Sequence, residues 1–204
     1  VDDHLIPPRS LLIRNEFNLK KPVAKAKVYA TGLGIYNLHL NGGKVGKDYL
    51  TPEWTDYHHR IQYQTYDVTD QLSQGVNTMG AILGNGWWSS DLGWPDPNKG
   101  LEWYNKDTLC FAAELHVTYK DGSKEKIFTD SGWKYDYSPI TENTILHGER
   151  YDARLEQEGW DTVGFNDEDW QPCEKFDMQF DHVVSQQQPP IRVVEELSPE
   201  KELK

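Results

Sequence analysis

Apolar and polar residues alternate with a period of two in several short stretches of this chain. In residues 108–119 the apolar side chains occupy every second position, namely Leu109, Phe111, Ala113, Leu115 and Val117. Ile35–Leu40 alternates in the same way and is followed by Asn41-Gly42, a pair that tolerates positive φ and favours a tight hairpin turn. Such alternation is typical of strands whose two faces differ. Because no long amphipathic helical pattern occurs, the sequence predicts an all-β fold.

The predicted strands and the composition of the two ends divide the chain into three parts. Further strands are predicted at Leu11–Leu19 and at residues 28–32, 60–68, 78–83 and 124–129, with a helical turn at residues 67–75. Residues 1–13 are interpreted as an N-terminal connector, and 14–175 as one β-sandwich of the jelly-roll or galactose-binding-like type. Residues 176–204, which contain Gln186 to Pro190, are interpreted as a linker and the start of a following domain.

Charge argues against a nucleic-acid partner, and hydropathy argues against a membrane span. The net charge is -12, from 33 acidic and 21 basic residues, and no cluster of Lys and Arg is dense enough to follow a phosphate backbone. We therefore expect no nucleic-acid partner. No apolar run approaches the roughly 20 residues that a membrane-spanning helix needs, so we expect no membrane span.

The two cysteines do not indicate a disulfide framework. Cys110 lies in the strand-like stretch TLCFAAELHV, and Cys173 lies near the end of the predicted sandwich. Their number and spacing match neither a disulfide-rich scaffold nor a metal site. We expect free, partly buried thiols.

Several motifs in fixed order carry a family resemblance. They are LNGGKVG, the Pro-x-Trp-Thr-Asp-Tyr segment at Pro52 to Tyr57, QYQTYDVTD, LGNGWW, LGW, GERYDARLEQEGWDT at 148–162, and PPIRVVEEL. Together these resemble the N-terminal β-sandwich domain of bacterial α-L-rhamnosidases of the glycoside hydrolase family 78 type, over about residues 14–197. A looser likeness, limited to the LNG and DVTD turns, extends to sandwich domains of β-galactosidases and β-glucuronidases.

The resemblance implies that the catalytic residues lie elsewhere. In α-L-rhamnosidases the acid and base belong to an (α/α)6 barrel that follows this domain, so we assign no catalytic residue here. Glu149 and Asp152 are the most tempting pair of carboxylates in the chain. The neighbouring Arg150 would keep both ionised, which suits an ion pair better than a general acid.

Carbohydrate binding is the function that the aromatic residues favour. A sugar offers an apolar C–H face for stacking and a rim of hydroxyls for polar groups. One loop supplies both kinds of partner: Asn85, Trp87, Trp88, Asp91 and Trp94. Asn41, Glu149 and Arg150 complete the predicted site if their loops share one end of the sandwich. Alternatively, these indoles support the long loop or dock a neighbouring domain. Trp54 is predicted to plug the core beneath its loop, with a sugar platform as the second interpretation.

The resemblance also bears on cofactors and partners. Some domains of this family bind rhamnose through calcium, for which Asp91, Asp96 and Asn98 are weak candidates, although their spacing matches no known calcium loop. No cofactor is required otherwise. The expected partners are L-rhamnose or a rhamnosylated glycan, and the middle and catalytic domains of the parent chain.

The segment 142–170, rich in carboxylates, is expected to wrap around the sandwich. The alternative function is a structural domain that braces the catalytic barrel and binds no sugar.

Overall fold

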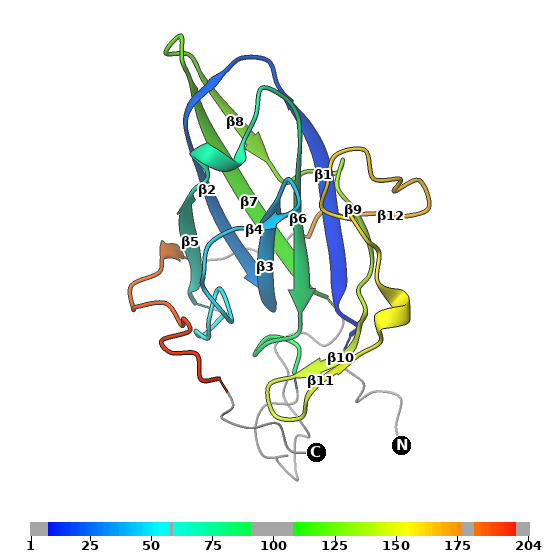
Figure 1. The fold of residues 1–204 in the computed structure, drawn as a ribbon. Helices are drawn as coiled ribbons and strands as arrows, with labels where there is room; N and C mark the ends of the chain where they lie inside the picture. Colours follow the sequence, from blue (N-terminus) through cyan, green and yellow to red (C-terminus); the bar gives the residue numbers. More distant parts are fainter. Residues whose placement is uncertain (1–7, 58, 91–107, 177–181, 199–204) are drawn as a thin grey trace.

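The computed structural model describes residues 8–57, 59–90, 108–176 and 182–198, which form two facing β-sheets (Figure 1). The first sheet has the order β12-β9-β1-β6-β3-β4, and the second has the order β13-β5-β2-β7-β8. All described neighbouring strands run antiparallel except β13, which is parallel to β5. This arrangement is the predicted all-β sandwich.

The strands of the first sheet are β1 (Leu11–Leu19), β3 (Ile35–Leu40), β4 (Gly43–Lys44), β6 (Gly75–Gly84), β9 (Lys134–Tyr137) and β12 (Gln171–Pro172). Those of the second are β2 (Val23–Leu33), β5 (Ile61–Asp67), β7 (Cys110–Tyr119), β8 (Lys124–Phe128) and β13 (Val183–Ser185). A separate hairpin consists of β10 (Ile140–Thr144) and β11 (Gly148–Tyr151), and two short 3-10 turns are η2 (Thr69–Gln71) and η3 (Ala153–Leu155).

The core lies between the sheets and follows the alternation of the sequence. The inward-facing Ala113, Leu115 and Val117 of β7 are buried, whereas Glu114 and His116 face outward. The Asn41-Gly42 turn forms as predicted, with both residues at positive φ, 49° and 85°. A second, smaller apolar cluster contains Leu33, Tyr57, Ile61 and Trp88.

Strand residues also occur outside residues 14–175, the range interpreted as the sandwich. Residues 11–13, assigned to the connector, belong to β1, and residues 183–185, assigned to the linker, form β13. The hairpin β10–β11 lies in a segment for which no strand was predicted. Its residues are intermediate or exposed, so they carry no alternation between buried and exposed faces.

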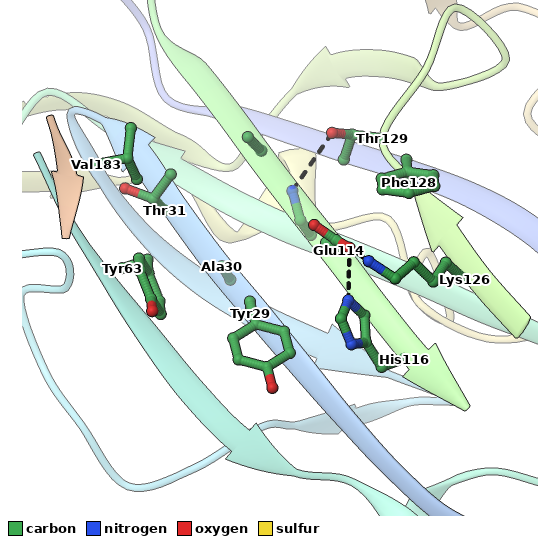
Figure 2. Close-up of a pocket in the computed structure, with 12 residues that line it drawn as sticks. Tyr29, Ala30, Thr31, Tyr63, Glu114, His116, Lys126, Phe128, Thr129 and Val183 are labelled. Atoms are coloured by element: carbon green, nitrogen blue, oxygen red, sulfur yellow. Dashed lines mark hydrogen bonds and ion pairs between the residues drawn. The ribbon is translucent and has the colours of Figure 1, made fainter. Parts of the chain in front are cut away.

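The outer face of the second sheet bears a groove with a volume of about 520 Å³ (Figure 2). Its floor includes Thr31 of β2 and Ala112 of β7, which lie directly opposite one another in the strand register. Taller side chains flank them, with Tyr63 of β5 on one side and Phe128 of β8 on the other. The groove exists because two short side chains are paired in the middle of a sheet that carries rings toward both edges.

None of the described residues forms a helix long and apolar enough to cross a membrane.

Candidate functional site

Three segments meet at one end of the sandwich, which we call the indole end: residues 51–57, residues 84–90 and the β10–β11 hairpin. Trp54 and Trp87 stack there, with ring centroids 6.3 Å apart and 4° between their planes. Trp54 is 58 % exposed and Trp87 is half-buried. The expectation that Trp54 plugs the core is therefore wrong. Tyr57, which is buried and touches Trp88 edge-on, fills that position instead.

Asn85 and Trp88 lie beneath the surface of this end. The Trp88 indole is 1 % exposed and donates its Nε1 hydrogen to the carbonyl of Thr108 at 2.7 Å. Asn85 is fully buried, and its Nδ2 donates to the carbonyls of Pro8 and Asn143, both at 2.9 Å. In this structure neither side chain offers a surface to a ligand, so the prediction that both contact a sugar directly needs correction. Their sequence neighbour Trp87 does reach the surface.

The β10–β11 hairpin brings Glu149 and Arg150 to the indole end. Asn143 of β10 pairs with Glu149 of β11, and Asn143 Oδ1 accepts a hydrogen bond from the backbone N–H of Asn85 at 2.6 Å. Arg150 is exposed and donates to Glu142 across the hairpin at 2.8 Å. The guanidinium is thus paired with Glu142, not with Glu149.

Buried polar atoms at this end are left without partners. Asn85 Oδ1, Asn143 Nδ2 and the hydroxyl of Ser90 are each buried and accept or donate no hydrogen bond. An unmade buried hydrogen bond costs about 1–3 kcal/mol. The interior of the indole end is therefore incompletely hydrogen-bonded.

Asn41 lies at the opposite end of the sandwich. In the pairing of β3 with β6, Ile35 is opposite Gly84 at the indole end, whereas Leu40 is opposite Met79. Six residues of strand correspond to about 20 Å. Asn41 is also fully engaged, since its Oδ1 accepts from the Thr78 N–H and its Nδ2 donates to Gln71 and Asn77. It supports the turn and does not join those predicted residues that the structure describes.

Four predicted residues, Asp91, Trp94, Asp96 and Asn98, lie outside the described residues. Within the described part of the chain, no group of three or more His, Cys, Asp or Glu side chains is arranged to hold a metal ion. The two cysteines are free, as expected.

The second carboxylate considered for catalysis, Asp152, is tied to an arginine. Arg154 donates to both of its oxygens, from Nε at 2.8 Å and from Nη2 at 2.6 Å. The hydrogen bonds from the Arg154 side chain and backbone lower the pKa of Asp152. A carboxyl held ionised in this way does not suit the role of a general acid at neutral pH.

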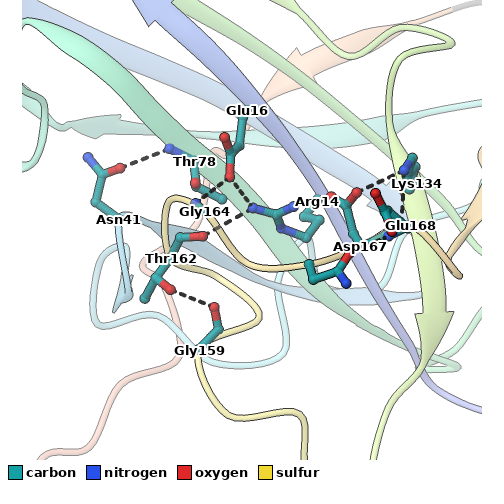
Figure 3. Close-up of polar contacts among 11 residues, drawn as sticks. Arg14, Glu16, Asn41, Thr78, Lys134, Gly159, Thr162, Gly164, Asp167 and Glu168 are labelled. Atoms are coloured by element: carbon teal, nitrogen blue, oxygen red, sulfur yellow. Dashed lines mark hydrogen bonds and ion pairs between the residues drawn. The ribbon is translucent and has the colours of Figure 1, made fainter.

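The motif GERYDARLEQEGWDT runs along the outer face of the first sheet, from the hairpin to the Asn41-Gly42 turn. Asp161 Oδ2 accepts a hydrogen bond from His39 Nδ1 at 2.7 Å, and the Gly42 N–H donates to the Asp161 carbonyl at 2.8 Å. Figure 3 shows how Arg14 of β1, which is 1 % exposed, holds this segment. Its guanidinium donates to Glu16 at 2.7 Å, to the carbonyl of Thr162 at 3.1 Å, and to Asp167. The expectation that residues 142–170 wrap the sandwich is confirmed.

Comparisons with known proteins identify this architecture. A family model described as the alpha-L-rhamnosidase N-terminal domain matches residues 21–195. The chain belongs to this family. The resemblance read from the motifs is thereby confirmed, and so is the sandwich fold of an α-L-rhamnosidase N-terminal domain.

Individual α-L-rhamnosidases are also similar to this chain in sequence and in structure. The α-L-rhamnosidase of Streptomyces avermitilis is 40% identical over 187 residues, or 91% of this chain and 18% of the relative. One from Formosa agariphila is 36% identical over 92% of this chain and 20% of the relative. A crystal structure of the Streptomyces avermitilis enzyme complexed with L-rhamnose superimposes with a TM-score of 0.86, at 38% identity, over 93% of this chain and 18% of that one. The enzyme from Aspergillus terreus gives 0.85 at 38% identity, over 94% and 22%.

This α-L-rhamnosidase N-terminal domain thus spans about one fifth of the length of the relatives that it matches. The sequence placed Trp87 in the predicted site and gave Trp54 a sugar platform only as its second interpretation, whereas the structure stacks the two rings. The available signal was the position of Trp54 in the Pro-x-Trp-Thr-Asp-Tyr segment, where a proline-containing loop cannot bury every side chain.

Proposed function

We propose that this domain recognises carbohydrate at its indole end and so helps a longer α-L-rhamnosidase to hold rhamnosylated glycans. The hydrolysis of α-L-rhamnosides belongs, in this proposal, to residues of the parent protein outside this domain. The observation that carries the proposal is the parallel pair Trp54 and Trp87, because an exposed aromatic face is what the C–H face of a sugar stacks upon.

Polar groups beside the pair support the same ligand. Glu149 and Arg150 project from the adjoining hairpin and are exposed. A neutral sugar matches this mixture, since its hydroxyls both donate and accept hydrogen bonds.

The proposal is tested by calorimetric titration of the chain with L-rhamnose, with and without calcium. Trp54→Ala and Trp87→Ala should each weaken binding about tenfold, which corresponds to about 1.4 kcal/mol. Tyr137→Ala is the matched control, because Tyr137 is 49 % exposed on β9 of the first sheet. Unchanged affinity in both tryptophan variants, each still folded, would show that the indole end does not bind this sugar. A calcium requirement would support Asp91, Asp96 and Asn98 as ligands.

A second function, the bracing of a neighbouring domain, is favoured by the C-terminal segment. Ile191, Val193, Val194 and Leu197 are 44–98 % exposed, although all four are apolar. Ile191 pairs with Tyr49, and Arg192 binds Asp48 at 2.7 Å, so the segment is fixed to the sandwich beside the loop that carries Trp54. Replacing Val194 and Leu197 by Ser in the parent enzyme should lower its melting temperature but leave that of the isolated domain unchanged. An unaltered parent would count against the brace.

A further inference from the structure

The groove on the outer face of the second sheet is separate from the indole end and has the features of a ligand site. Its volume of about 520 Å³ lies within the range of small-molecule sites, about 300–1,000 Å³. It is open along the sheet surface, and its residues come from strands β2, β5, β7, β8 and β13 (Figure 2). Strands held by a continuous ladder of hydrogen bonds form a rigid base, so the groove is preformed.

Three aromatic rings line the groove. Tyr29 and Tyr63 meet edge to face, with centroids 5.9 Å apart and 69° between planes, and Phe128 is 52 % exposed. Tyr29 also rests against the ring of His116 at 4.9 Å. None of these rings belongs to the buried core, so their side chains are not needed to hold the two sheets together.

The ionisable groups of the groove are paired with one another. Glu114 accepts a hydrogen bond from Lys126 at 2.7 Å, and its Oε1 lies 2.5 Å from Nε2 of His116. The Lys126 hydrogen bond, followed by that of His116, keeps the pKa of Glu114 below its usual range. The carboxylate and the ammonium therefore balance each other, and the groove presents no surplus charge to attract an ion. The net charge of -12 on the whole chain further disfavours an anion.

Rings that stack, hydroxyls that hydrogen-bond and charges that cancel match the chemistry of a neutral sugar. Thr31 and Thr129 add hydroxyls near the floor and flank, and Tyr29 and Tyr63 add phenolic hydroxyls. The lining residues are spread over five neighbouring strands, which suits several linked sugar rings better than one. We propose that this groove is a second binding site, for a short neutral oligosaccharide.

This site does not depend on the indole end, but the choice of a rhamnose-containing probe rests on the proposed function. Two sites on one domain would let it hold two parts of the same glycan, at the end of the sandwich and along its face.

The test is calorimetric titration of the chain with a neutral rhamnose trisaccharide, with trigalacturonate as the anionic comparison. The groove variants are Tyr29→Ala and Phe128→Ala, the indole-end variant carries Trp54→Ala and Trp87→Ala together, and Tyr137→Ala is the control on the other sheet. Circular dichroism and thermal melting identify any variant that does not fold. Because Tyr29 lies on β2 and Phe128 on β8, Phe128→Ala tests the groove even if Tyr29→Ala destabilises the sheet.

We expect two binding events for the trisaccharide: each groove variant should weaken one of them at least about tenfold and leave the other, the indole-end variant should weaken the other event instead, and the control should retain both. Trigalacturonate should bind less tightly than the neutral trisaccharide. Two undiminished binding events in both groove variants would overturn the site, as would tighter binding of trigalacturonate or no binding by the folded wild type. If the trisaccharide loses binding only in the indole-end variant, the proposed function stands and the groove is not a glycan site. If only the groove variants lose all binding, the groove is a glycan site and the indole end is not.

Discussion

The rings of Trp54 and Trp87 lie parallel, with 4° between their planes, although they come from loops before β5 and after β6. The second loop places Trp87 at the surface and the next residue, Trp88, in the interior. Two adjacent indoles thus have different environments, and the half-buried Trp87 gains its partner from another part of the chain. This pairing turns two isolated rings into one extended apolar surface beside polar side chains.

Trp88 and Trp54 should differ in their contributions to stability. Trp88→Ala removes a fully buried ring and the hydrogen bond to Thr108, so the free energy of unfolding should fall by about 3–5 kcal/mol. Trp54→Ala removes a ring that is 58 % exposed and should change the free energy of unfolding by about 0.5 kcal/mol or less. Urea denaturation of both variants checks this. Equal losses would mean that Trp54 is also part of the core.

Gly80 should not tolerate a side chain. A methyl group at this position of β6 would lie 2.6 Å from the Trp160 ring and 2.8 Å from the carbonyl of Ile13. Gly80→Ala should therefore cost about 1–3 kcal/mol, because either the ring or the strand must move. Gly43→Ala is the control, since its nearest neighbour would be 3.7 Å away. Thermal melting compares the two, and an unaffected Gly80→Ala would show that Trp160 does not pack there.

Asp167 should contribute to stability near neutral pH and lose this contribution in acid. Burial alone would raise the pKa of its carboxyl, but Lys134 and Arg14 outweigh burial and lower it. The folded state therefore binds this proton less readily than the unfolded state. The stabilisation is present above the unfolded pKa, about 3.9, and disappears as the pH falls through the folded pKa.

The variant Asp167→Asn should accordingly show a smaller loss of stability between about pH 5 and pH 2 than the wild type. Asp70→Asn, at an exposed position of η2, serves as the matched control. Urea midpoints measured across this range give the slopes. Identical slopes for Asp167→Asn and the wild type would contradict the stabilising role of the ion pairs that Asp167 makes with Arg14 and Lys134.

The two cysteines should react slowly while the protein is folded. Burial raises the pKa of Cys110 to about 12 and that of Cys173 to about 11. Since the thiolate is the reactive form, alkylation by iodoacetamide at pH 8 should be roughly a hundredfold slower or more than in urea. Mass spectrometry over time gives both rates. Rapid labelling of the native protein at either position would show that its thiol is accessible and ionised.

The raised pKa also predicts weaker stability in alkali. Above about pH 9 the unfolded thiol ionises while the folded Cys110 thiol stays protonated, so the unfolded state binds fewer protons and stability falls as the pH rises. Cys110→Ala should reduce this fall between pH 9 and pH 11 in urea titrations, whereas Ser123→Ala, in the exposed turn before β8, should not. A slope unchanged by Cys110→Ala would contradict this assignment.

Local patterns were sufficient where a strand has one buried and one exposed face. Ile35–Leu40 was predicted with its observed bounds, and Leu11–Leu19 likewise, because alternation reports burial directly. The hairpin β10–β11 was missed because its residues lack such a contrast. At the candidate site the sequence identified the loop of Trp87, but it also grouped Asn41 with that loop. Strand pairing separates the two by the length of β3.

The sequence by itself determined the strands, the tight turn at Asn41-Gly42 and the family, since each depends on residue types at short and fixed spacing. Only the tertiary structure decided that Trp87 is half-buried and Trp88 fully buried, that Trp54 completes the stacked pair, and that Thr31 and Ala112 form the floor of a groove. These relationships join residues distant in the chain. Strand register and loop packing set them, and no local pattern encodes them.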